Sequence, residues 1–113
     1  MRFDIVEVDG ATTRLVLDGR MDAPGCERIE TPFTAAASAA GKNILVDMTG
    51  VAYIGSLGIR LLISNARVVQ RRGRKLVIYG AQEQPTDVFE TVALGDLIPI
   101  AASQQEAMGL LAG

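Results

Sequence analysis

One contiguous segment narrows the choice of fold more than any other feature of this sequence. Residues 43–48 read Asn-Ile-Leu-Val-Asp-Met, a short apolar run between Gly41 and Gly50. Short apolar runs bounded by glycine are typical of a strand that is buried on both faces of a sheet. Residues 43–48 are therefore the predicted central strand.

The residues that follow complete a strand–helix–strand unit. An apolar-periodic segment runs from Ser56 to residue 72 and is followed by Gly73, the residue type expected just past a helix end. Residues 75–79 form a second short apolar run and predict another buried strand. Buried strands that alternate with helices predict an α/β fold.

The rest of the chain continues this alternation. Asp9-Gly10 separates two apolar stretches and predicts a turn between two strands. Pro32 should kink or restart the first helix, because proline lacks the amide donor. The remaining elements are expected, in chain order, as strands at 3–8 and 15–17, a helix at 24–40, a helix at 85–93, a strand at 97–100 and a helix at 103–111.

Length, composition and charge limit the kind of protein that this chain can be. A chain of 113 residues, of which 49% are hydrophobic, is long enough for one core and too short for two, so residues 1–113 are expected to form a single domain. The formal net charge of -2 gives no general attraction to nucleic acid or to an acidic membrane. Function is therefore expected in local surface chemistry.

The cysteine and histidine content limits the kinds of site that this chain can form. Cys26 is the only cysteine and histidine is absent, so an intramolecular disulfide and a Cys/His metal cluster are both excluded. Cys26 is expected to be a small buried hydrophobic residue. No basic stretch followed by an apolar segment opens the chain, and no apolar run reaches the roughly 18 residues of a membrane span. A reducing cytoplasm is the expected location.

The helix expected from Ser56 carries apolar residues on two sides. At ~100° per residue, one face is expected to pack on the core, and it holds Ile59, Leu62, Ile63, Ala66 and Val69. Leu57, Leu61 and Val68 fall on roughly the opposite side, where a surface helix is usually polar. They are interpreted as a partner-contact stripe. The alternatives are a helix buried on both sides, or scattered exposed apolar residues.

The charged residues give little sign of other chemistry. Arg60, Arg67 and Arg71 run along one flank of the stripe, where they either steer an acidic partner or form a solvated flank. The basic cluster at 71–75 is short and lacks interleaved aromatic residues, so nucleic acid binding is not expected. Asp47 has no histidine or second carboxylate pattern beside it and is interpreted as structural. Nothing matches a phosphate loop or a dinucleotide motif, so neither a cofactor nor catalysis is expected.

Several short motifs follow one another in a defined order. They are Gly19-Arg20-Met21-Asp22, Ile44-Leu45-Val46-Asp47-Met48, Tyr53-Ile54-Gly55-Ser56-Leu57-Gly58-Ile59-Arg60-Leu61-Leu62, Phe89-Glu90-Thr91 and Leu97-Ile98-Pro99-Ile100. In this order and spacing, the chain resembles a STAS domain of the anti-sigma factor antagonist type over nearly its whole length. The resemblance implies a mixed sheet of four or five strands, with about four helices packed mainly on one side.

The resemblance also implies a function for Ser56. In the family's switching members, an anti-sigma factor that is itself a serine kinase phosphorylates the serine at this position, and a phosphatase reverses the modification. The implied function is a non-enzymatic module that binds the anti-sigma factor when Ser56 is unphosphorylated and releases it when Ser56 is phosphorylated. A serine at a helix N-terminus faces outward, and the flanking Gly55 and Gly58 would let a partner's backbone approach. The other interpretation of Ser56 is an ordinary helix N-cap.

Two positions keep alternatives open. Many family members carry an aspartate where this chain has Gly55, which favours members that are never phosphorylated. One such alternative is a constitutive cytoplasmic subunit of an ABC-type lipid-trafficking transporter, in which Ser56 would be only a contact and a cap. Asp22 matches a family aspartate at the partner surface, but it also fits a helix N-cap ahead of Pro24.

Overall fold

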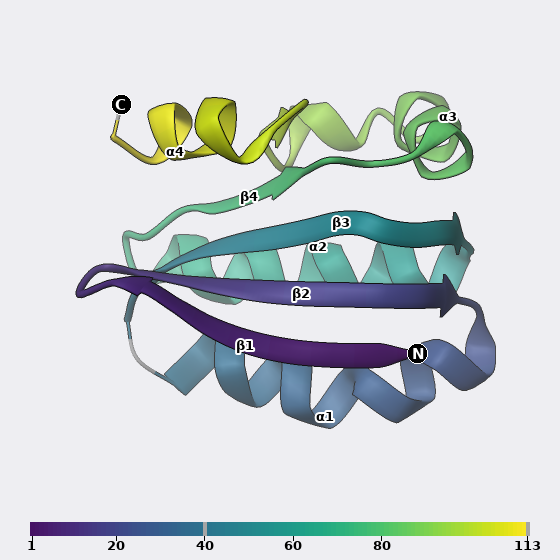
Figure 1. Ribbon diagram of the computed structural model, residues 1–113, viewed down its shortest axis with the longest axis horizontal. Coiled ribbons are helices and arrows are strands. Elements are labelled where there is room, and N and C mark those ends of the chain that lie inside the picture. Colours follow the sequence, from purple (N-terminus) through teal and green to yellow (C-terminus); the bar gives the residue numbers. More distant parts are fainter. Residues whose placement is uncertain (40, 113) are drawn as a thin grey trace.

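The computed structural model describes residues 1–39 and 41–112, which form a five-stranded mixed sheet with helices on both faces (Figure 1). The strands lie in the order β1-β2-β3-β4-β5; β1 is antiparallel to β2, and the other neighbouring pairs are parallel. The elements are β1 (Arg2–Asp9), β2 (Thr12–Met21), α1 (Ala23–Ala39), β3 (Asn43–Ile54), α2 (Ser56–Arg71), β4 (Leu76–Tyr79), α3 (Glu83–Thr91), a short 3-10 helix η1 (Leu94–Asp96), β5 (Ile100–Ala101) and α4 (Gln104–Ala112). The expected α/β class is confirmed.

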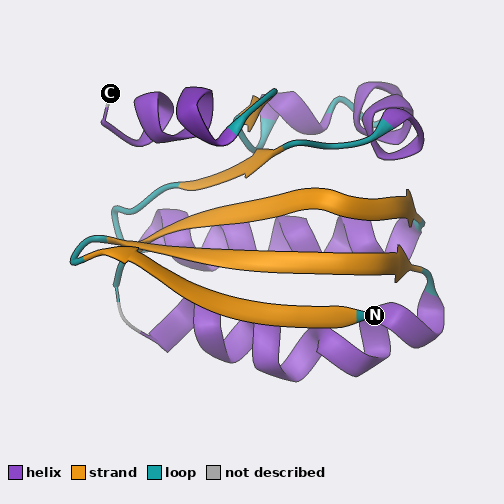
Figure 2. Ribbon diagram, viewed as in Figure 1, coloured by secondary structure: helices purple, strands orange, loops and turns teal. Residues whose placement is uncertain are grey.

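The main core lies between the sheet and the helices α1, α2 and α3. Alternate residues of a strand face opposite sides, and Leu15 and Leu17 of β2 both point into this core and are fully buried. Phe33 of α1, Leu62 of α2 and Phe89 of α3 pack into the same cluster. Helices α1 and α2 link parallel neighbours, β2 to β3 and β3 to β4, and they pack against each other (Figure 2).

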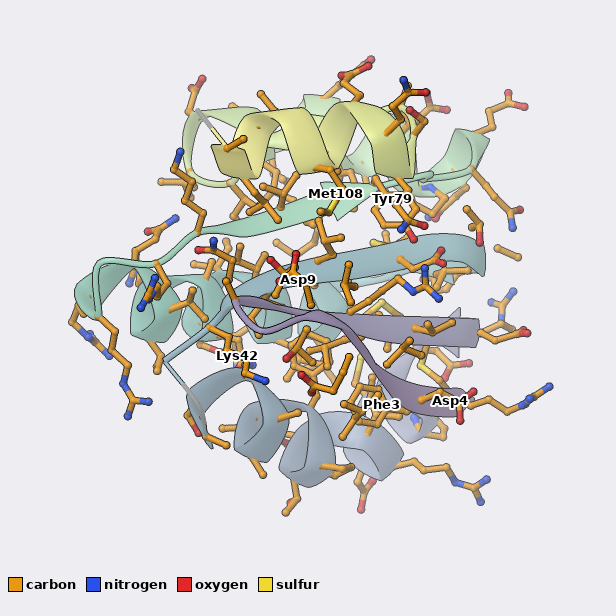
Figure 3. All side chains as sticks on the ribbon, turned by 60° about the vertical axis from the view of Figure 1, so that its left-hand side comes forward. Phe3, Asp4, Asp9, Lys42, Tyr79 and Met108 are labelled. Carbon is orange, nitrogen blue, oxygen red and sulfur yellow. The ribbon has the colours of Figure 1, made fainter. Side chains whose placement is uncertain are left out.

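A smaller cluster on the other face of the sheet attaches α4. Leu45 of β3 and Val77 and Tyr79 of β4 pack with Ala107 and Met108 of α4. Tyr79 and Met108 lie together beneath this helix (Figure 3). The helices of the described residues therefore lie mainly on one side of the sheet, as the resemblance implied, with α4 on the other.

The first helix continues through its proline. Pro32 lies inside α1, which runs as one element, so the helix does not restart there. Because Pro32 has no amide hydrogen, the Arg28 carbonyl lacks its helical donor. Both residues are exposed, so water can solvate that carbonyl. The expected end of this helix at Ala40 lies outside the described residues.

The prediction of a strand at 97–100 is wrong in its bounds. The chain makes the 3-10 turn η1 first, and the amides of Leu97 and Ile98 both donate to the carbonyl of Leu94. Ile98 thus enters the main core from a turn rather than from a strand. Strand β5 begins only after Pro99, which has no amide to donate to a ladder.

Candidate functional site

The candidate site lies where β2 and β3 end, at the edge of the sheet from which α1 and α2 begin (Figure 1). Met21 and Ile54 are the last paired residues of the two strands. The Gly55 amide then donates to the Met21 carbonyl at 3.1 Å, and the Gly55 carbonyl accepts the Ile59 amide at 3.1 Å. Gly55 therefore joins the end of the sheet to the first turn of α2.

Gln84 of α3 holds the end of β3 from the other side. Strand β4 pairs with β3 only from Ile44 to Asp47, so the last residues of β3 have no strand partner on this side. The Ile54 amide donates to Gln84 Oε1 at 2.8 Å, and Gln84 Nε2 donates to the Ile54 carbonyl at 3.1 Å. The Gln84 side chain takes the place of a strand partner, and no pattern in the sequence predicted this role.

Ser56 is the first residue of α2 and is exposed. The N-cap of this helix is Gly55, with extended φ and ψ angles of -111° and -172° and no capping bond from a side chain. The interpretation of Ser56 as the N-cap is therefore wrong. No hydrogen bond of the Ser56 hydroxyl occurs among the residues that the structure describes, so this oxygen is accessible to another protein.

The two glycines beside Ser56 differ in their surroundings. Gly58 is buried, and a Cβ at this position would stand 2.6 Å from Ile54 Cγ1 and 3.1 Å from Met21 Cβ. The expectation that Gly58 offers its backbone to a partner is therefore wrong, because it allows close packing inside the domain. A Cβ on the half-buried Gly55 would stand 3.3 Å from the Tyr53 hydroxyl.

Asp22 is the N-cap of α1. Its Oδ1 accepts the Gly25 amide at 2.9 Å, and its Oδ2 lies 3.5 Å from Arg20 Nε. The hydrogen bond from the Gly25 amide, with a smaller contribution from Arg20, holds the pKa of Asp22 below its ordinary value. The capping interpretation is confirmed, and contact of Asp22 with a partner stays a prediction.

The proposed stripe on α2 is only partly exposed. Leu57 is 42% exposed, but Leu61 is only 6% exposed and belongs to the main core, and Val68 is half-buried. The expectation of an exposed Leu61 is wrong, because α1 packs on this side of α2. Arg60, on the same helix, is exposed.

A groove of about 330 Å³ remains between α1 and α2. It is lined by Ala23, Cys26, Glu27, Glu30, Thr34, Leu57, Arg60, Leu61 and Ser64. Cys26 is 5% exposed, which confirms its expected burial, and this burial raises the pKa of its thiol. The groove therefore presents apolar side chains together with charged ones from both helices.

Asp47 has a structural role, as predicted, because it bonds within β3 and links β3 to β4. It accepts hydrogen bonds from the Thr49 amide at 2.9 Å, the Thr49 hydroxyl at 2.7 Å and the Tyr79 hydroxyl at 3.0 Å. Burial alone would raise the pKa of Asp47, but these bonds outweigh it and hold the pKa below its ordinary value. Burial and the Asp47 carboxylate raise the pKa of Tyr79 to about 12.

Within residues 1–39 and 41–112, no group of three or more His, Cys, Asp or Glu side chains is placed to hold a metal ion. In the same part of the chain, no helix has the length and apolar character needed to span a membrane.

Comparison with known protein families matches the STAS domain over residues 2–107. The chain therefore belongs to the STAS domain family, which confirms the resemblance seen in its sequence. A curated relative, the anti-sigma-B factor antagonist of Listeria monocytogenes, is 24% identical over 106 residues, which are 94% of this chain and 93% of the relative.

Solved structures share the fold over almost the whole chain. An anti-sigma-factor antagonist (STAS) domain protein from Planctomyces limnophilus has a TM-score of 0.86 and 19% identity, and the match covers 98% of both chains. The Bacillus cell fate determinant SpoIIAA in its phosphorylated form has a TM-score of 0.71 and 20% identity, with 96% of this chain and 97% of that chain covered.

Proposed function

We propose that this protein is a cytoplasmic anti-sigma factor antagonist whose binding is controlled by phosphorylation of Ser56. The observation that carries the proposal is the state of the Ser56 hydroxyl, which is exposed at the start of α2 and takes no part in capping the helix. The relative from Listeria is named as an antagonist of an anti-sigma factor, and one structural neighbour was solved in a phosphorylated form. Both names are consistent with a modifiable serine here.

The physical effect of phosphorylation would be concentrated at the surface. A phosphate adds roughly -1.5 to -2 charges at neutral pH. Ser56 is exposed and lies outside both hydrophobic clusters, so the added charge can remain in contact with water. A partner surface pressed onto Ser56 would have to desolvate the phosphate, which is unfavourable unless the partner supplies a matching charge. Binding is therefore lost while the domain stays folded.

In this proposal the partner is an anti-sigma factor with serine kinase activity, and a serine phosphatase restores the binding form. The contact surface includes Ser56, the neighbouring Gly55 and the exposed Leu57 and Arg60. Asp22 lies at the same edge of the sheet and extends this surface. The protein itself performs no catalysis in this scheme.

Mass spectrometry of the protein purified from its native cell tests the proposal. We expect one phosphate on the peptide that contains Ser56, at a stoichiometry that changes between unstressed and stressed growth. A Ser56→Ala variant expressed in the same cell is the control and should carry no phosphate. An unmodified Ser56 in every growth condition would contradict the proposed switch.

A second candidate function follows from Gly55, which stands where many family members carry an aspartate. In this case the protein is a constitutive cytoplasmic subunit of an ABC-type lipid-trafficking transporter, and Ser56 is only a contact. An unmodified Ser56, together with co-purification of an ATPase and a permease, would support this function over the switch.

A further inference from the structure

Arg20 is held in place at the same edge of the sheet as Ser56. Its guanidinium carbon lies 4.3 Å from the centre of the Tyr53 ring, the residue opposite it on β3. Its Nε lies 3.5 Å from Asp22 Oδ2, while the side chain as a whole is 61% exposed. The ion pair involves one of the five N–H donors of the guanidinium. The two terminal nitrogens are left to face another anion.

Tyr53 links this arginine to the residue that precedes Ser56. The Tyr53 hydroxyl and Cε1 lie 3.3 Å and 3.6 Å from the position that a Cβ on Gly55 would take, and Gly55 directly precedes Ser56. The Tyr53 ring therefore lies against the residue before Ser56, and Arg20 lies over that ring. A Cβ at position 55 would make a close contact with the Tyr53 hydroxyl, so the glycine leaves the ring more space.

We propose that Arg20 binds the phosphate group when Ser56 is phosphorylated, and that Arg20 is thereby withdrawn from the surface that faces the partner. This inference rests on the proposed modification of Ser56 and adds the residue that receives the new charge. Phosphorylation then acts twice on the interface, because it introduces an anion and occupies an exposed cation.

The charges around Ser56 favour this pairing. Asp22 lies at the same edge, and a phosphate beside its carboxylate would be repelled unless a cation stood between them. Arg20 can stand between the two anions without releasing Asp22, because its Nε stays with the carboxylate. Its two terminal nitrogens form a fork that fits phosphate oxygens. The cap of α1 is unaffected, because it uses the other oxygen of Asp22.

Arg60 is the competing cation. It lies four residues after Ser56 on α2, at a spacing that allows side chains on one helix to pair. Arg60 also lines the groove between α1 and α2, but among the described residues no aromatic ring stacks on it and no carboxylate pairs with it, so its guanidinium is not ordered in advance. Stacking on Tyr53 orders Arg20 in advance, which lowers the entropy lost when it binds.

The test uses protein in which phosphoserine is installed at position 56 during translation, with the phosphate followed by phosphorus NMR as the pH is changed. A nearby cation lowers the second pKa of a phosphoserine, which is ordinarily about 6. We expect this pKa to be about half a pH unit higher in Arg20→Gln than in the unsubstituted protein, the size of effect that one exposed ion pair produces. The matched control Arg60→Gln should leave it unchanged.

An equal phosphate pKa in Arg20→Gln and the unsubstituted protein would overturn the inference, as would a rise seen only in Arg60→Gln. Circular dichroism of each variant checks that the fold is retained, which we expect because both arginines are exposed. Since the phosphoserine is installed during translation, the result does not depend on any kinase. Failure of the inference is therefore distinct from failure of the proposed switch, which only protein from the native cell can show.

Discussion

Gly58 shows how one missing side chain positions the start of α2. A Cβ at this position would stand 2.6 Å from Ile54 Cγ1 and 3.0 Å from Ile54 Cδ1, and Ile54 is 1% exposed. We expect Gly58→Ala to lower the free energy of unfolding by about 1–3 kcal/mol, the usual effect of overpacking a core. Urea unfolding followed by circular dichroism measures this change.

Gly109→Ala is the matched control for Gly58→Ala. Gly109 also lies within a helix, but a Cβ there would have nothing within 4 Å. Alanine is favoured over glycine in a helix, so this variant should be unchanged or more stable by up to about 1 kcal/mol. Equal destabilisation by the two substitutions would contradict the packing role of Gly58.

The position of Ser56 could be predicted from sequence, but the surroundings of Gly58 could not. Glycine punctuation and the helical period are local signals, and they correctly placed the start of α2 at Ser56. The space around Gly58 depends on the pairing of Met21 with Ile54 across β2 and β3. That pairing brings together residues far apart in the sequence, and no short motif encodes it.

Among the elements, α2 carries both an exposed and a buried leucine on one flank. Leu57 is 42% exposed and Leu61, one turn later, is 6% exposed. We expect Leu61→Ala to lower the free energy of unfolding by about 2–5 kcal/mol, as for a buried leucine, and Leu57→Ala to change it by about 0.5 kcal/mol or less. Thermal and urea unfolding of the two variants measures these changes. An equal loss of stability in Leu61→Ala and Leu57→Ala would contradict the expectation.

Helical periodicity predicted one buried side of α2 and missed the second. Projection of the sequence at ~100° per residue correctly placed Leu62, Ala66 and Val69 in the core. The projection left Leu61 on the outer side because it considers one helix alone. In the structure, α1 packs against the side of α2 that carries Leu61. The two hydrogen bonds between Gln84 and Ile54 were missed for a related reason. A single glutamine that takes the place of a strand partner leaves no periodic pattern in the sequence.

For the whole molecule, the hydrogen bond from Tyr79 to Asp47 couples stability to pH at both extremes. The pKa of Asp47 is lowered on folding, so its contribution to stability is fully present above its ordinary pKa of about 4 and is lost as the pH falls through the lower folded value. The pKa of Tyr79 is raised to about 12, so stability is lost as the pH rises from its ordinary value of about 10 towards 12.

Tyr79→Phe should therefore flatten both flanks of the stability profile. Without the hydroxyl, Asp47 loses one of the hydrogen bonds that lower its pKa, and residue 79 no longer titrates in alkali. Urea unfolding at a series of pH values between about 2.5 and 11.5 spans both transitions. The control is Tyr53→Phe, which removes a hydroxyl beside Gly55 and should keep both slopes. Unchanged slopes in Tyr79→Phe would mean that the bond across β3 and β4 does not carry this coupling, and that other groups set both flanks.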